Sequence, residues 1–164
     1  AFKVYEFDAH GVEMNHRYAS SAVAADGQPE PAFTKDRELH FEQTTWPGAR
    51  IPHAWLFGEG NKKASTLDLC GHGTFTILTG IGGKAWVDAA NALSAELGLP
   101  LTSHVIGPRQ QWQDHYGDWA RAREVGDAGV VLVRPDHHVA WRSEGIAADP
   151  EGELRRVFKT ILDR

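Results

Sequence analysis

The stretch GVVLVRPDHHVAWR, residues 129–142, predicts a β-hairpin. VVLVR is rich in β-branched residues, and HVAWRS is a plausible returning strand, so a strand is expected on each side of a turn. Pro135 suits the first corner of a type I turn, and Asp136 is a common turn residue. In the returning strand Val139 and Trp141 share one face, which we expect to be the core face.

A β-α-β pattern precedes the hairpin. TFTILT (74–79) and LTSHVIG (101–107) have the composition of strands, and KAWVDAANALSAELG lies between them. Gly98 is the expected C-terminal cap of that helix. Four apolar residues at offsets 0, 4, 7 and 11 form one helical stripe, namely Trp86, Ala90, Leu93 and Leu97.

A second amphipathic helix is predicted after the hairpin. Asp149 is a suitable N-cap, and Pro150 takes the first helical position. Its apolar stripe consists of Leu154, Val157, Phe158, Ile161 and Leu162. With a short helix expected around 119–124, the order from Thr74 is β-α-β-(α)-β-β-α, which is a thioredoxin-like order. We therefore predict an α/β domain over 65–164, with a parallel, right-handed β-α-β unit and an antiparallel hairpin at its edge.

Residues 1–64 have a different character. Turn-rich runs such as AADGQPEPAF, TTWPGARIPH and FGEGNKK alternate with short stretches such as RELHFEQ and HAWLF. This irregular, β-rich segment has too few apolar elements to form a core alone. We expect it to pack against something else and to link to other domains.

The composition excludes several classes of function. The net charge is −5 with scattered basic residues, so no nucleic-acid partner is expected. No apolar run of membrane-spanning length occurs, and the start lacks the features of a signal peptide, so no membrane partner is expected either. The single cysteine, Cys70, suits a reducing, cytoplasmic environment. The first residue is not Met, which fits a chain that is processed or cut from something longer.

Thiol chemistry is not expected. A thioredoxin-like redox site needs C-x-x-C where the first strand meets the helix, and this chain has GIGGKAW there. Cys70 lies upstream without a partner, so a small buried apolar role is favoured. His72 follows Cys70 closely in LCGHG, but closeness in sequence is weak support for a nucleophile–base pair.

Two other chemical hypotheses lack a required partner. GIGGKA (80–85) matches a dinucleotide loop, but the next strand ends in VIGPRQ, without the acidic residue that binds a ribose, so a plain tight turn is favoured. His137 and His138 would leave opposite faces of an extended strand, and in a turn His137 would point to solvent. We therefore predict no catalytic, cofactor-binding or metal-binding residue in this chain.

Four segments carry a resemblance to a known family. RYASSAVAADG, TTWPGARIPHAWL, STLDLCGHGTFTILTG and HYGDWARAREVGDAGVVLVRPDHHVAWR resemble the C-terminal end of flavin-dependent aromatic hydroxylases of the phenol and 2,4-dichlorophenol monooxygenase type. The resemblance implies a thioredoxin-like C-terminal domain without redox cysteines that follows FAD and substrate domains. It also implies a parent enzyme that hydroxylates phenolic rings with FAD, NAD(P)H and O₂.

The flavin motifs of that family lie upstream of the matching region, so no FAD-binding residue is transferred to this chain. We expect the chain to be structural or interface-forming, with Arg50, His53 and Trp55 as candidates for contact with the FAD and substrate domains. The plainer alternative is a solvent-facing Arg50 and His53 with Trp55 in the local core. A free-standing, redox-inactive thioredoxin-like binding module is the alternative function. Apolar surface exposed in 1–64 would favour self-association, so a homo-oligomer stays open.

Overall fold

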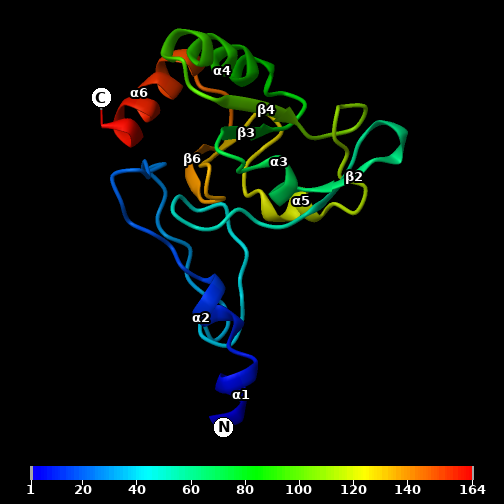
Figure 1. The fold of residues 1–164 in the computed structure, drawn as a ribbon, viewed down its shortest axis with the longest axis vertical. Coiled ribbons are helices and arrows are strands. Elements are labelled where there is room, and N and C mark those ends of the chain that lie inside the picture. Colours follow the sequence, from blue (N-terminus) through cyan, green and yellow to red (C-terminus); the bar gives the residue numbers. More distant parts are fainter. Residues whose placement is uncertain (1, 164) are drawn as a thin grey trace.

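A central four-stranded sheet lies between two layers in the computed structural model, which describes residues 2–163. Helices α4 and α6 cover one side of the sheet, α3 and α5 lie on the other, and α1 and α2 form an arm that leaves the body (Figure 1). In chain order the elements are α1 (Phe2–Phe7), α2 (His10–Met14), β1 (Trp55–Phe57), η1 (Glu59–Asn61), β2 (Lys63–Ser65), α3 (Thr66–Leu69), β3 (Phe75–Thr79), α4 (Lys84–Leu97), β4 (Leu101–Val105), α5 (Asp118–Ala122), β5 (Val130–Val133), β6 (Val139–Ser143) and α6 (Pro150–Leu162).

The predicted order of elements is confirmed. The strand order in the sheet is β4-β3-β5-β6, with β3 parallel to β4 and antiparallel to β5, and with β5 antiparallel to β6. The β-α-β unit is thus parallel, and the hairpin adds antiparallel strands on the other side of β3. The outer edge of β6 is also paired, because Ala24 N–H donates to Ala140 O (2.8 Å) and Gly48 N–H donates to Val139 O (2.8 Å).

Helices α4 and α6 bury their predicted stripes against one face of the sheet. Asp149 caps α6 by accepting from Gly152 N–H (3.0 Å), and Gly98 ends α4 in the left-handed conformation. The last residue of the α4 stripe, Leu97, is 36% exposed and borders an open groove of about 280 Å³ between the ends of α4 and α6. The helical core includes Trp86, Ala90, Leu93, Trp141, Leu154 and Phe158.

The hairpin turn is as predicted, but the returning strand is not regular. His137 N–H donates to Arg134 O (3.1 Å) across the turn, and His137 itself takes a positive φ of 67°. Val133 pairs with Val139 whereas Leu132 pairs with Trp141, so Ala140 is an extra residue. This bulge places Val139 and Trp141 on opposite faces, which corrects the prediction that they share one.

The other face of the sheet is covered largely by chain without regular structure. Ile51, Ala54 and Leu56 pack there against sheet residues, so this part of residues 1–64 does contribute to a core. The strand content of that segment is lower than predicted, because its described part holds only β1 and the start of β2, and RELHFEQ forms no strand. We call this cluster the second core; it consists of Ile51, Ala54, Leu56, Ala64, Cys70, Leu78, Ile106, Trp112, Trp119, Val125, Val131, Val133 and Val139.

A buried ionic network fixes the base of the arm to the sheet. The Arg142 guanidinium in β6 donates to Asp26 (2.6 Å), Glu124 (2.5 Å) and the Thr45 hydroxyl (3.0 Å). Beyond that point the arm has little cover, and the Phe7 side chain is 72% exposed.

Candidate functional site

Cys70 lies in the second core and is fully buried. Burial raises the pKa of its thiol to about 12, and the Thr76 hydroxyl only partly offsets this effect. Because the thiolate is the reactive form, Cys70 is inert at neutral pH. His72 is exposed, so the two side chains have different environments. The prediction of a buried, apolar role for Cys70 is confirmed.

The glycine turn between β3 and α4 is held by hydrogen bonds and close contacts within the chain. Gly82 N–H donates to Asp127 O (2.9 Å), and Gly83 N–H donates to Gly80 O (3.0 Å). A Cβ on Gly83 would lie 1.7 Å from the Thr79 hydroxyl oxygen, so its surroundings are already filled by protein. A dinucleotide needs several N–H groups that are free to reach its phosphates, and two of this turn's N–H groups already bond within the chain, so the turn is a poor fit for FAD.

The two hairpin histidines have separate environments. The His137 ring packs on Gly71, and its Nε2 lies 3.1 Å from Leu67 O, so the expectation that it points to solvent is wrong. His138 Nδ1 lies 3.0 Å from Asp136 O, and its ring meets the Tyr18 ring edge-on at 5.1 Å. Within residues 2–163, no three His, Cys, Asp or Glu side chains are grouped to hold a metal ion.

The three candidate contact residues all lie on the surface. Arg50, His53 and Trp55 are exposed, while the neighbouring Ile51 and Ala54 are buried in the second core. From His53 to Trp55 the alternation follows from the extended backbone, in which successive side chains point to opposite sides. Trp55 is 38% exposed, so the alternative that placed it in the local core is wrong.

Trp55 is the centre of a small cluster. The His53 ring meets it edge-on with ring centroids 4.9 Å apart, and Lys63 Nζ lies 3.8 Å from the Trp55 ring centroid. The contact with Lys63 was missed from the sequence because it depends on the pairing of β1 with β2, which places Lys63 opposite Phe57 and therefore diagonal to Trp55. The cluster presents a partly exposed Trp ring, and Trp is among the residues enriched at contact surfaces between proteins.

Sequence comparison identifies relatives over nearly the whole chain. The chain is 50% identical over 98% of its length to a 2,4-dichlorophenol 6-monooxygenase of Cupriavidus pinatubonensis, and 52% identical over 93% to a phenol 2-monooxygenase of a Pseudomonas species. It covers 27% and 25% of those proteins. The chain thus spans about a quarter of the length of the relatives that it matches.

Solved structures give the same result. The flavin-dependent monooxygenase PieE, in complex with FAD and substrate, matches with a TM-score of 0.87 and 47% identity over 95% of this chain and 26% of PieE. Aklavinone-11 hydroxylase, with FAD and aklavinone, matches with a TM-score of 0.77 and 39% identity over 91% of this chain and 26% of its own. The model of the family described as aromatic-ring hydroxylase, C-terminal, matches residues 44–164. The chain therefore belongs to the family of C-terminal domains of aromatic-ring hydroxylases.

Proposed function

We propose that this chain is the C-terminal domain of a flavoprotein monooxygenase that hydroxylates phenolic rings with FAD, NAD(P)H and O₂. The family match carries the proposal, and two relatives named for phenol and dichlorophenol substrates support the substrate class. The chain itself has a structural or interface-forming role and holds neither the flavin nor the reacting atoms.

The non-catalytic role is supported by the environments of the groups in this chain that were considered as catalytic or ligand-binding candidates. The Cys70 thiol is buried, the Gly82 and Gly83 N–H groups of the glycine turn bond within the chain, and the hairpin histidines have separate partners. The flavin chemistry belongs to the cofactor, which a protein must hold and orient, and the other three quarters of such an enzyme supply that framework.

Arg50, His53 and Trp55 contact the FAD and substrate domains of the parent enzyme in this proposal. Their exposure beside a covered core supports the assignment. The division into a linking segment (1–64) and a thioredoxin-like domain (65–164), a cytoplasmic location and a homo-oligomeric state belong to the same proposal. In the described part of the chain, no helix has both the length and the apolar character needed to cross a bilayer.

The first test is to read the gene upstream of the codon for Ala1. An open frame encoding a strand–GxGxxG–helix unit is expected, and the full-length product should be yellow and consume NAD(P)H with a phenol. A start codon directly before Ala1 would instead support a free-standing binding module. Residues 1–164 alone should stay colourless after mixing with FAD and gel filtration, and stoichiometric retention of FAD would contradict the non-catalytic role.

A further inference from the structure

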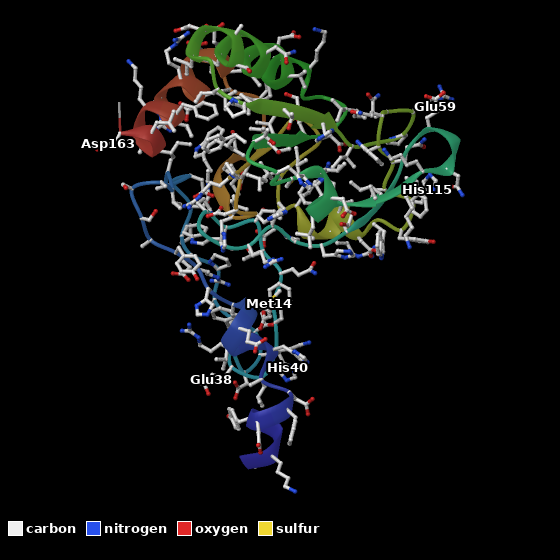
Figure 2. The ribbon with its side chains drawn as sticks, viewed as in Figure 1. Met14, Glu38, His40, Glu59, His115 and Asp163 are labelled. Atoms are coloured by element: carbon white, nitrogen blue, oxygen red, sulfur yellow. The ribbon has the colours of Figure 1, made fainter. Side chains whose placement is uncertain are left out.

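The far part of the arm lies outside both apolar cores of the chain. This part, which we call the outer arm, consists of α1, α2 and a returning segment (34–42) that runs beside α2 (Figure 1). Figure 2 shows Met14, Glu38 and His40 together on the outer arm, away from the body. None of the described residues of the outer arm belongs to either core cluster. The outer arm must therefore be held together by other contacts.

Polar contacts give the outer arm its shape. Asn15, directly after α2, is 7% exposed, and its Nδ2 donates to Arg37 O (2.8 Å) and to His40 O (2.7 Å). The Asn15 Oδ1 accepts from Glu42 N–H (3.0 Å). Gly11 also lies against the returning segment, because a Cβ on it would come within 2.0 Å of Arg37 O. Both residues that these contacts bury, Gly11 and Asn15, lack an apolar side chain.

The two helices of the outer arm are too short to be stable alone. α1 has six residues and α2 has five, whereas isolated helices shorter than about 12–15 residues are marginal in water. A single side-chain hydrogen bond, from the Tyr5 hydroxyl to Asp36 (3.4 Å), joins the described side chains of α1 to the returning segment. Helices in proteins owe most of their stability to the packing of an apolar face, so α1 and α2 require a packing surface from outside this chain.

The outer arm also carries the apolar side chains that such a surface would cover. Phe7 is 72% exposed, more than any other large hydrophobic residue in the part of the chain that the structure describes. Val12 is 53% exposed and Tyr5 is 46% exposed. All three lie on the two adjacent short helices, and apolar side chains that gather on an exposed surface mark a contact with another surface.

The polypeptide joined to α1 identifies the occupant. The family model begins at residue 44, after the arm, whereas the match to the 2,4-dichlorophenol 6-monooxygenase covers 98% of the chain and so includes the arm. The arm is thus shared with that enzyme but lies outside the part that defines the C-terminal domain. In the proposed parent enzyme the preceding polypeptide is covalently linked to α1, and a short link of this kind gives an effective concentration on the order of millimolar.

We infer that the outer arm packs into the part of the parent polypeptide that precedes residue 1, with Phe7 and Val12 against an apolar surface of that part. This inference rests on the proposed function, and it adds a contact at the outer arm to the one proposed for Arg50, His53 and Trp55. A second copy of the chain lacks the covalent link, so an exchange of arms between two copies would depend on protein concentration.

Hydroxyl-radical footprinting of the full-length parent enzyme tests the inference, with flavin content measured first by visible absorbance. For each residue, the rate in urea divided by the rate in native enzyme gives a protection factor. Val12 should be protected about tenfold more than Ile81 (53% exposed) and Ile146 (50% exposed), two aliphatic controls on the body, because a docked surface packs like a protein interior. Equal protection of the three residues in flavin-loaded enzyme overturns the inference, whereas enzyme without flavin contradicts the proposed function instead.

A substitution on the outer arm gives a second measurement. Phe7→Gln in the full-length enzyme should lower the protection factor of Val12 several-fold, because it removes an apolar ring from the packed surface. Ile146→Gln, at an exposed position on the body, should leave that factor unchanged. Equal effects of the two substitutions contradict the inference. If the protection of Val12 falls on dilution, together with a halving of the sedimenting mass, the arm is exchanged between two copies and the inference is wrong.

Discussion

Arg142 joins three segments that are far apart in the sequence. Its guanidinium binds Asp26 of the arm, Glu124 after α5 and Thr45 of the covering segment. The Asp26 side chain is only 3% exposed, so the pair is removed from water. Such a pair adds little net stability, but loss of one member leaves an uncompensated buried charge. Removal of Arg142 would therefore leave the buried Asp26 carboxylate without its ion-pair partner.

Arg142→Ala should lower the free energy of unfolding by about 3–5 kcal/mol, measured by urea denaturation at pH 7. Arg156→Ala is the matched control, because Arg156 pairs with Glu153 on the surface and its loss should cost less than about 1 kcal/mol. Adding Asp26→Ala to Arg142→Ala should recover part of the loss. Equal destabilisation by the two arginine substitutions would show that Asp26 is not buried as described.

His104 is the residue for which a pH dependence is expected. Burial lowers the pKa of His104 below its usual 6.5, and its Nδ1 is buried without a hydrogen-bond partner. The unfolded chain therefore binds more protons than the folded chain as pH falls through the unfolded pKa toward the lower folded pKa. The contribution of neutral His104 to folding stability is therefore fully present above the pKa that His104 has in the unfolded chain. It is lost as the pH falls from that value toward the lower pKa of the folded chain.

His104→Gln should make the free energy of unfolding fall less between pH 7.5 and pH 5 than it does in the unmodified chain. Parallel profiles for the unmodified chain and His104→Gln would contradict the assignment.

Single residues differ in how much of their role the sequence reveals. The inert role of Cys70 could be predicted, because a lone cysteine in an apolar context lacks every partner that thiol chemistry needs. The exposure of Trp55 could not be decided, since it depends on which side of an extended segment faces the sheet. The contacts of Trp55 with Lys63 and of Phe57 with His115 arise from strand and loop pairing, which local composition does not specify.

Among the elements, helices and strands were predicted well and the irregularity within the hairpin was not. The stripes of α4 and α6 and their caps are local patterns with a period of 3.6 residues, so the sequence displays them directly. The bulge at Ala140 adds one residue to a strand without any mark in the composition. Both faces of the sheet are buried, so an apolar residue is accommodated on either side. The strand therefore lacks the alternation of apolar and polar residues from which an extra residue could be recognised.

The hairpin turn also docks on the loop after α3. Gly71, with φ of 84°, lies under the His137 ring, and a Cβ there would come within 2.5 Å of that ring. Gly73, with φ of 79°, has open space around it. Gly71 and Gly73 thus share the backbone requirement, but only Gly71 is in a tight contact.

Gly73→Ala should cost about 1 kcal/mol from backbone strain alone, and Gly71→Ala should cost about 1–3 kcal/mol more because the His137 ring must move. The difference between the two variants should shrink in a His137→Ala background, as urea denaturation would show. A difference of the same size in that background would mean that His137 is not the obstacle.

At the scale of the whole molecule, the sheet depends on residues that precede it by a long way. Residues 1–64 were predicted to need a packing partner, and Ile51, Ala54 and Leu56 pack on the sheet. The division at residue 64 stays a prediction, and truncation is the measurement that decides it. The composition of the sequence changes near residue 64, but the second core contains residues from both sides of that position. Chain without regular structure before residue 64 can still supply buried apolar side chains.

A chain of residues 65–164 should bind the dye ANS and lose its near-UV circular dichroism, because one face of the sheet becomes uncovered. A chain of residues 44–164, the range of the family model, should keep a native-like near-UV spectrum. If residues 65–164 alone gave that spectrum without ANS binding, they would be an independent domain and the second core would be dispensable.

The irregular cover over the sheet also constrains biosynthesis. Ile51 N–H donates to His137 O, and Ile51 packs in the same core as Val139, so the partners of this segment are synthesised long after it. At roughly 5–20 residues per second, the ribosome leaves the segment without its sheet for several seconds. During that interval its apolar residues are open to chaperones and to other nascent chains. Slower translation between the segment and the hairpin would prolong this exposure.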